Sequence, residues 1–356
     1  MNKRRLSRRD LLKASVSAAA ASTVFAAPLR AAAPAATAIT PALIEAARKE
    51  GKLLYYTSID LPLAERIAKS FEAKYPGITV RVERSGAERI FQRIGQEYSS
   101  RIYGVDVAQT SDAAHFILWK RDGWLSSFVP EDVAKHYAAE HRDGDGMFAS
   151  FRVSLSAVGY NTNLVKAEDA PKSFADLLDP KWMGKIVKAH PAYSGTIMTA
   201  TFQIVRELGW GYLERLAKQK VMQVQSATDP SKKLALGERA VSADGGEYNL
   251  LQVKEGGGPV EVVYPSEGIP LVVGPNAVFK NAPNPNAARL FQCYCFTPEC
   301  QQLISDFGGL RSMHPLVKEK AGRKPFREIK TMKEDAAGVE KASEEIKTRY
   351  AKLFGV

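Results

Sequence analysis

The most constraining feature of this sequence is a pattern that occurs three times between residues 52 and 124. Each copy has a short β-prone run, a loop rich in hydroxyl side chains and an amphipathic helix; the strand-like runs are KLLYYTS (52–58), ITVRVERS (78–85) and VDVAQT (105–110). Three such units with short loops predict a parallel sheet wound with helices, whose ligands bind beyond the carboxyl ends of the strands. Those ends carry the candidate binding residues Thr57, Ser58, Ser85, Gly86, Thr110, Ser111 and Asp112.

Some of these hydroxyl residues have an alternative role as helix caps. Ser85 and Glu88 have the spacing of a capping box, and Thr110 or Ser111 is placed to cap the third helix. Capping and ligand contact do not exclude each other, so both interpretations stay open.

A second α/β region is predicted from residue 151 onward. The run FRVSLSAVGYN (151–161) is β-rich; a helix, a turn at Pro180 and another strand follow it. Further helices are expected after Pro191 and at residues 228–238, extended segments between residues 260 and 279, and one amphipathic C-terminal helix from Asp335.

The first 33 residues are interpreted as an export signal, cleaved between residues 26 and 36. Five basic residues precede an alanine-rich stretch that is too short and too often broken by serine to favour a membrane anchor. The run SRRDLLK (7–13) resembles a twin-arginine signal, which implies export of the folded chain to the periplasm. No cysteine lies in this segment, which excludes a lipoprotein anchor.

The remaining composition indicates an ordinary globular protein. The signal supplies +6 of the net charge of +11, and the mild excess of +5 that remains has no basic stripe, so nucleic acid is not an expected partner. The three cysteines, Cys293, Cys295 and Cys300, are expected to be buried; a Cys295–Cys300 disulfide is the alternative, and metal binding by them is disfavoured.

The segment HPAYSGT (190–196) has the features of an anion-binding helix start. Backbone N–H groups at the first turn of a helix have no intrahelical partners and carry the positive end of the helix dipole. Gly195 lets a ligand approach the backbone, and the hydroxyls of Ser194 and Thr196 add donors. Simple capping by Ser194 is the alternative.

Several motifs taken in order resemble type II periplasmic solute-binding proteins of ABC importers. These are YNTNLV (160–165), SFADLLDPKWMGKIV (173–187), SGT (194–196), VVYPSEG (262–268) and the stretch from residue 282 to 304. The similarity covers essentially the whole mature chain, and the nearest branch contains ferric-ion, phosphonate and sugar-phosphate binders.

The resemblance implies two α/β lobes, each with a mostly parallel sheet, joined by extended crossovers. It places residues 39–156 and 265–308 in the first lobe and residues 157–264 and 309–356 in the second. The crossovers are expected near residues 156–160 and 263–265, one helix over 286–304 in the first lobe, and the tail after Gly308 on the second lobe. A solute would be held in the cleft between the lobes.

By the same resemblance, Ser194, Gly195 and Thr196 face the cleft opposite Ser58, Ser85 and Ser111. The remaining site candidates are acidic or aromatic: Asp112, Glu247 and Glu267, which suggest an amine or a cation if they reach the cleft, and Tyr160, Tyr248 and Tyr264. Ferric binders of this branch use two adjacent tyrosines, whereas ADGGEYNLL (243–251) has Tyr248 alone. Tyr55 and Tyr56 are adjacent but lie on a strand, where neighbouring side chains point to opposite faces.

The sequence therefore predicts a monomeric periplasmic binding protein, not an enzyme, that captures a small anionic solute by hinge closure. No catalytic motif is present and the five histidines are dispersed; no cofactor or metal is predicted. Its expected partners are the solute, an ABC permease in the inner membrane and the twin-arginine export machinery. Two alternatives stay open: a ferric-ion binder of the same family, and a ligand-presenting partner of a sensor or chemoreceptor.

Overall fold

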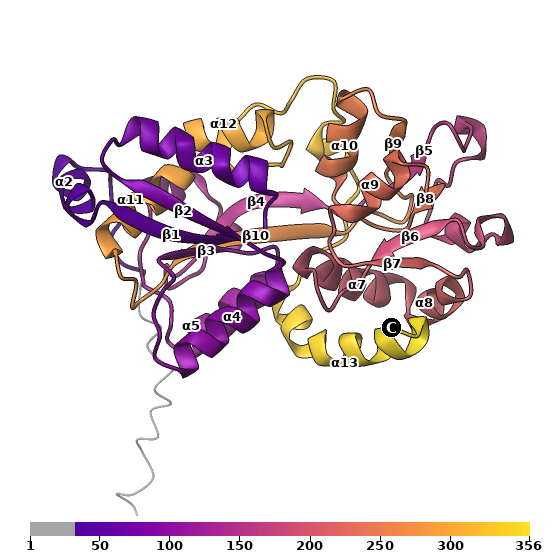
Figure 1. Cartoon of the computed structure of the whole chain (residues 1–356), viewed down its shortest axis with the longest axis horizontal. Coiled ribbons are helices and arrows are strands. Elements are labelled where there is room, and N and C mark those ends of the chain that lie inside the picture. The colour runs from indigo at the N-terminus through magenta and orange to yellow at the C-terminus, as the bar shows by residue number, and fades with distance from the viewer. Residues whose placement is uncertain (1–32) are drawn as a thin grey trace, which may run out of the picture. The chain divides into compact units, whose positions relative to one another are not determined.

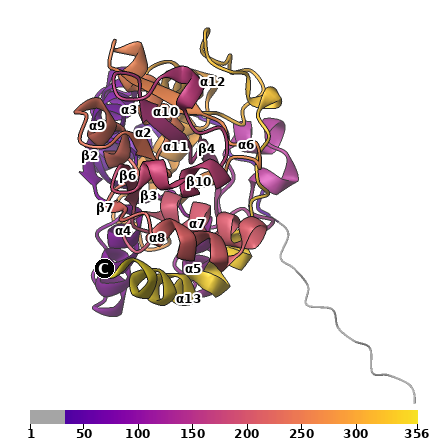
Figure 2. The same cartoon turned by 90° about the vertical axis from the view of Figure 1, so that its right-hand side faces the viewer.

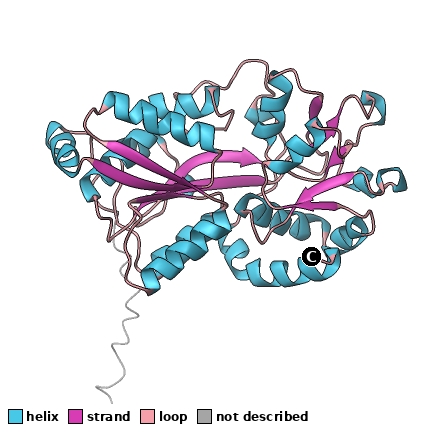
Figure 3. Ribbon diagram, viewed as in Figure 1, coloured by secondary structure: helices cyan, strands magenta, loops and turns pink. Residues whose placement is uncertain are grey.

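The computed structural model describes residues 33–356, which form two five-stranded sheets with helices on both faces of each (Figures 1 and 3). Residues 1–32, and with them nearly all of the predicted export signal, lie outside the described residues. No helix in residues 33–356 combines the length and the apolar character that a membrane span requires. We call each sheet, with the helices that pack on it, a lobe.

The sheet of the first lobe has the strand order β2-β1-β3-β10-β4. Its strands are β1 (Lys52–Thr57), β2 (Thr79–Arg84), β3 (Val107–Gln109), β4 (Ala149–Leu155) and β10 (Leu271–Val278). Its helices are α2 (Pro41–Glu50), α3 (Leu61–Lys74), α4 (Ala87–Ser99), α5 (Ala113–Arg121), α6 (Glu131–His136), α11 (Pro285–Cys295) and α12 (Pro298–Asp306).

Side chains of β1 alternate between the two faces of this sheet, as the strand period requires. Tyr55 packs with Phe71 and Phe291 in the core under α3 and α11, whereas Tyr56 packs with Ile90 and Trp119 in the core under α4 and α5. Neither tyrosine of the adjacent pair is left over for a ligand site.

The sheet of the second lobe has the order β7-β6-β8-β5-β9. Its strands are β5 (Val158–Asn161), β6 (Ile186–Ala189), β7 (Met222–Val224), β8 (Val241–Ser242) and β9 (Val260–Val263). Its helices are α7 (Gly195–Leu208), α8 (Trp210–Ala217), α9 (Asp229–Ala235) and α10 (Glu247–Glu255), and α13 (Ala336–Phe354) ends the chain. Where one helix was expected before Pro180, the chain forms two short 3₁₀ turns, Ala175–Leu178 and Pro180–Trp182.

Both sheets are mixed rather than simply parallel, because each contains one reversed strand. β10 is antiparallel to β3 and β4, and β5 is antiparallel to β8 and β9. The physical reason is the crossing of the chain between the lobes. β5 and β10 each enter their sheet from the other lobe, so they run away from the other lobe, whereas the other strands of each sheet run toward it. The two crossings lie side by side, since Ser156 N donates to Pro270 O at 3.0 Å.

Two expectations about the C-terminal part differ from the structure. The helix expected over 286–304 is two helices, α11 and α12, because Pro298 cannot continue the first; Thr297 caps the second through the Cys300 amide. The tail was expected on the second lobe, but α13 lies against α7 of the second lobe and also against α5 of the first (Figures 1 and 2). The three cysteines are buried and unpaired.

Candidate functional site

A small cavity lies between the two lobes, at the carboxyl ends of the first-lobe strands and the amino ends of several helices. The empty space in and around it, open solvent at the mouth included, is about 370 Å³. From the first lobe it is lined by Ser58, Arg84, Gly86, Ala87, Ser111 and Arg152, and from the second by Tyr193, Ser194, Thr196, Ser226, Ala227, Thr228, Gly246 and Tyr248. The amino ends of α4, α5, α7 and α10 therefore meet at one place, and their dipoles make it electropositive.

Arg152, in the middle of β4, is the most unusual residue of the cavity. It is only 2% exposed, and among the described residues no carboxylate lies within 4.0 Å of its guanidinium. Nη1 donates to Ser154 Oγ at 3.2 Å, but Nε has no hydrogen-bond partner. Burial lowers the pKa of Arg152, yet an arginine remains protonated in proteins. The charge of Asp60 acts on Arg152 only from beyond 4.0 Å, so in the described residues this buried cation has no ion-pair partner.

Arg84, at the end of β2, adds a second cation at the more exposed side of the cavity. Its Nε donates to the carbonyl of Ile59 at 3.2 Å, which leaves the two terminal nitrogens of the guanidinium for another partner. A buried charge is costly unless it is paired, so the buried Arg152 favours an anionic ligand over a cation, and the exposed Arg84 adds to the positive charge.

The lobes touch around this cavity. Thr196 N, at the start of α7, donates to Ser111 Oγ at 3.1 Å, and Arg89 Nη2 donates to Gln225 Oε1 at 2.7 Å. A Cβ atom on Gly195 would lie 2.7 Å from Asp112 Cβ, and one on Gly86 would lie 2.7 Å from Tyr193 O. These two glycines permit the backbones to approach, so the lobes are in contact around the cavity.

The hydroxyl of Tyr248 keeps its proton in the protein without a bound cation and can donate a hydrogen bond at this site. Burial, followed by the charge of Asp60, raises the pKa of Tyr248 to about 12. Asp60 precedes α3 without capping it, and burial also raises the pKa of its carboxyl group. A phenol that keeps its proton can donate a hydrogen bond to an anion but does not provide the phenolate that a hard cation prefers.

Six of the residues predicted from sequence line the cavity: Ser58, Gly86, Ser111, Ser194, Thr196 and Tyr248. Five others lie directly behind it. Thr57 Oγ1 bonds Gln109 Oε1 at 3.1 Å, Thr110 Oγ1 contacts His115 Nδ1 at 3.2 Å, and Ser85 N donates to Thr57 O. Gly195 and Asp112 form the close contact between the lobes.

Two of the expected helix caps are different in the structure. The N-cap of α4 is Gly86, so Ser85 and Glu88 form no capping box. The cap of α5 is Asp112, whose Oδ1 accepts from Ala114 N at 2.9 Å, and neither Thr110 nor Ser111 has this role. Ser194 does cap α7, through Ile197 N at 3.4 Å, so it combines capping with a place on the cavity wall.

Four predicted site residues do not reach the cavity. Glu247 is buried beside it but is neutralised by Arg311, at 2.8 Å, and accepts from Tyr264 OH at 2.5 Å. Glu267 caps the turn at 174–175 by accepting from two backbone amides, both at 3.1 Å. Tyr160 packs in the core of the second lobe because its strand is covered on that face.

Behind the first-lobe wall lies a buried network of ionisable groups. His115 Nε2 is 3.0 Å from Glu88 Oε1 and 3.8 Å from Asp112 Oδ2, and Lys347 Nζ of α13 is 3.2 Å from Glu88 Oε2. Burial raises the pKa of Asp112 to about 6. The ammonium group of Lys347 occupies the place that a cation would take beside Glu88, so we assign this network to the packing of α13.

Sequence reasoning missed Arg84, Arg152, Ser226 and Thr228. Arg152 was detectable only as a charged residue inside a run whose neighbours Phe151 and Val153 are apolar; all seven residues of β4 are buried. Ser226 and Thr228 precede a predicted helix, and their hydroxyls lie 3.0 Å apart. This helix start was recognised, but its position beside the first lobe depends on the fold.

The chain has two lobes with a cavity between them, and the comparisons with known proteins agree with this architecture. Residues 114–330 match the family described as bacterial extracellular solute-binding protein, and the chain belongs to that family. A protein of Haemophilus influenzae described as uncharacterized is 27% identical over 266 residues, 72% of this chain and 76% of the relative.

Solved structures share the fold over most of the chain. AfuA, a periplasmic binding protein from Actinobacillus pleuropneumoniae solved with fructose-6-phosphate, superposes with a TM-score of 0.78 at 22% identity, covering 86% of this chain and 99% of its own. Iron-bound HitA from Pseudomonas aeruginosa superposes with a TM-score of 0.73 at 24% identity, covering 84% and 99%. The fold is that of type II periplasmic binding proteins.

Proposed function

We propose that this chain is the periplasmic solute-binding component of an ABC importer and that its solute is a small anion: a phosphonate, a phosphate ester or a carboxylate. The single observation that carries the proposal is Arg152, a buried guanidinium that lines the cavity and has no carboxylate partner among the described residues. Membership of the solute-binding family supports the transport role, and the crystallised neighbour AfuA binds a phosphate ester.

The proposed mechanism needs binding and closure but no covalent step. In the open form, Arg84 and Arg152 attract the anion to the first lobe. Closure brings the start of α7 and the 226–228 loop onto the other side, where backbone N–H and hydroxyl groups replace the water around the anion. The ligand stabilises the closed form, and we expect the permease to recognise that form.

The remaining features of the predicted function belong to this proposal. They are the division of the chain into residues 39–156 with 265–308 and residues 157–264 with 309–356, export through the twin-arginine pathway, removal of the signal, and action as a monomer.

We favour an organic anion over a bare ferric ion. The cavity is lined by two tyrosines, Tyr193 and Tyr248, that are not adjacent in sequence, and by two cations that would repel Fe³⁺. The ferric-ion alternative would fit this cavity if the iron were bound together with a companion anion such as citrate. A binding protein that presents its ligand to a sensor or chemoreceptor would use the same cavity. Only the protein to which it docks would distinguish it from an importer subunit.

A thermal-shift screen of the mature protein tests the proposal. Phosphonates, phosphate esters, carboxylates, polyamines and ferric citrate are compared, because a ligand that binds only the native state raises the unfolding midpoint. The screen includes wild type, Arg152→Gln and the control Arg327→Gln, whose side chain is 86% exposed. We expect one anion class to stabilise wild type and the control but to lose about 100-fold in affinity for Arg152→Gln.

The same variant separates a ligand role for Arg152 from a structural one. Removing an unpaired buried charge is expected to leave the stability of the ligand-free protein unchanged or higher, while affinity falls. Equal anion binding by wild type and Arg152→Gln would refute the anion site, and a shift with ferric citrate that no other citrate salt reproduces would replace it with the iron alternative.

A further inference from the structure

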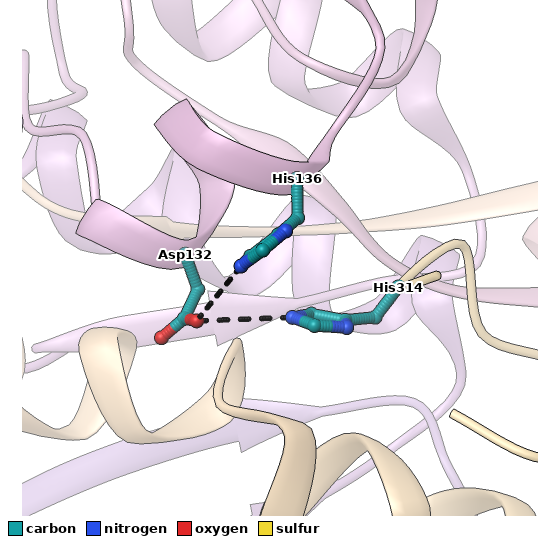
Figure 4. Close-up of side chains that lie close together, drawn as sticks. All are labelled: Asp132, His136 and His314. Atoms are coloured by element: carbon teal, nitrogen blue, oxygen red, sulfur yellow. Dashed lines mark ion pairs between the residues drawn. The ribbon is translucent and has the colours of Figure 1, made fainter. Parts of the chain in front are cut away.

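A second cluster of ligand-type side chains lies away from the interlobe cavity, between α6 and the tail that follows α12. It consists of Asp132, His136 and His314, whose donor atoms all lie within 4.8 Å of one another (Figure 4). Asp132 and His136 are four residues apart on α6 and therefore share one face of that helix. His314 comes from a segment almost 180 residues further along the chain, so only the fold brings the three together.

The distances leave these groups without hydrogen bonds to one another. Asp132 Oδ1 is 3.7 Å from His314 Nε2 and 4.0 Å from His136 Nε2. Both exceed the range of hydrogen bonds. Nε2 of His314, whose side chain is 0% exposed, has no hydrogen-bond partner. In the described part of the chain no lysine or arginine lies within 4.0 Å of the Asp132 carboxylate either.

These spacings are close to those around a transition-metal ion. With bonds of about 2.0–2.2 Å to nitrogen or oxygen in a tetrahedron, neighbouring donor atoms stand roughly 3.4 Å apart. The two measured separations need to shrink by only about half an ångström to reach that value. The side chains of Asp132 and His136 are 28% and 30% exposed, which gives an ion access from solvent and leaves a fourth position for water.

We propose that Asp132, His136 and His314 bind a divalent transition-metal ion of the zinc class through two imidazole nitrogens and one carboxylate oxygen. Imidazole and carboxylate are ligands that suit Zn²⁺, and three protein ligands with an open fourth position form a known type of zinc site. None of the three residues lines the interlobe cavity, so this site is independent of the proposed solute site.

Metal binding has one local consequence at His314. Its Nδ1 accepts a long hydrogen bond, 3.3 Å, from Leu316 N, which places the ring proton on Nε2 in the empty protein. Coordination through Nε2 moves that proton to Nδ1 and ends the bond from Leu316 N. The turn at 314–317 must therefore adjust, and the Leu316 amide becomes more exchangeable with solvent when the metal binds.

The metal would fasten the tail to the first lobe. Three residues before His314, the backbone of Arg311 pairs with Val153 of β4, while its side chain binds Glu247 of α10. A metal between α6 and His314 fixes the start of the tail on the first-lobe side, ahead of the segment that reaches α13. We expect the bound ion to raise thermal stability, because it adds a link absent from the unfolded chain.

The test is metal titration of the full mature protein after removal of metal with a chelator. Zn²⁺ binding is measured by calorimetry, and Co²⁺, whose visible spectrum reports its ligands, replaces Zn²⁺ in a second titration. The variants are His136→Asn, His314→Asn and the control His141→Asn, a half-buried histidine outside the cluster. Arg152→Gln is included to separate the metal site from the solute site.

We expect one Zn²⁺ per chain for wild type, His141→Asn and Arg152→Gln, and a loss of at least about tenfold in affinity for His136→Asn and His314→Asn. His136 is partly exposed, so His136→Asn is expected to fold and decides the result even if His314→Asn does not. No saturable binding by wild type, or equal binding by wild type and His136→Asn, would overturn the proposal.

Discussion

The two walls of the interlobe cavity differ in charge. The first-lobe wall contains both cations, Arg84 and Arg152, whereas the second-lobe wall has hydroxyls, backbone N–H groups and two tyrosines, Tyr193 and Tyr248, but no charged side chain. Cations on both walls would repel each other in the empty protein and oppose closure. An arrangement with charge on one side lets the first lobe attract an anion and lets the neutral second lobe close over it.

Ionisable groups also lie behind the first wall. Among variants of these groups, Asp112→Asn is expected to change the free energy of unfolding most. Folding raises the pKa of this carboxyl group from 3.8 to about 6, so the folded protein binds its proton more tightly than the unfolded chain. The stability associated with that proton is present below about pH 4 and is lost as the pH rises through about 6. At neutral pH wild type thus carries a penalty of roughly 3 kcal/mol.

Asparagine removes this penalty and remains a good N-cap for α5. We expect Asp112→Asn to raise the free energy of unfolding by up to about 3 kcal/mol at pH 7 and by almost nothing at pH 4. Urea unfolding at both pH values measures this, with the exposed Asp122→Asn at the other end of α5 as control. A gain that is the same at both pH values would show that charge burial is not the cause.

The contact between the walls is tested by Gly195→Ala. A Cβ atom at this position meets Asp112 Cβ at 2.7 Å and Ala87 Cβ at 3.1 Å, so the closed form becomes overpacked while each lobe is unaffected. A strain of about 2 kcal/mol lowers solute affinity about 30-fold. Calorimetry with the solute identified by the screen measures the loss, and Gly211→Ala, where a Cβ meets nothing within 4 Å, is the control. Unchanged affinity would mean that solute binding does not require this contact.

Arg84→Gln examines the exposed cation of the first wall. We expect about a tenfold loss of affinity for an anionic solute, and a weaker dependence of affinity on salt, because an exposed charge is screened more than a buried one. Arg81→Gln is a matched control on the same strand, 76% exposed and paired with Glu83. If Arg84→Gln and Arg81→Gln have the same solute affinity and the same salt dependence, Arg84 contributes only to the general surface charge.

Ser226→Ala is expected to have the smallest effect, because it removes one neutral donor from the second wall. The loss of one such hydrogen bond, about 0.6 kcal/mol, corresponds to roughly threefold in affinity. The exposed Ser99→Ala serves as the control in the same calorimetric titration. A loss larger than that of Arg84→Gln would reverse the proposed division between a charged wall and a neutral one.

Three residues of each wall were predictable from sequence, Ser58, Gly86 and Ser111 on the first and Ser194, Thr196 and Tyr248 on the second, but the charge of the first wall was not. Tyr248 was found through the family resemblance, whereas Ser194 and Thr196 follow signals that act over a few residues: a cap and a glycine at a helix start. Such signals predict local backbone geometry, and the structure has α7 and α10 beginning where these residues stand.

The position of Arg152 depends on interactions that no local pattern contains. Its strand lies at the edge of the first sheet, and its neighbouring strand there is β10, which returns from the second lobe more than a hundred residues later. The same dependence explains Glu247 and Glu267, which sequence reasoning considered as possible partners of an amine or a cation if they reached the cleft. Arg311 and the amides of 174–175, which neutralise or bond them, come from distant segments.

In the proposed mechanism of opening and closure, the packing of α13 against both α5 and α7 affects how long a solute stays bound. To open the cleft, the protein must separate this helix from one of the two lobes or slide it along them, and the Lys347–Glu88 ion pair must break if it leaves the first lobe. A helix that never touches the solute thus sets part of the barrier to release. Residence time is then determined near the C-terminus, whereas the choice of solute is determined in the cavity.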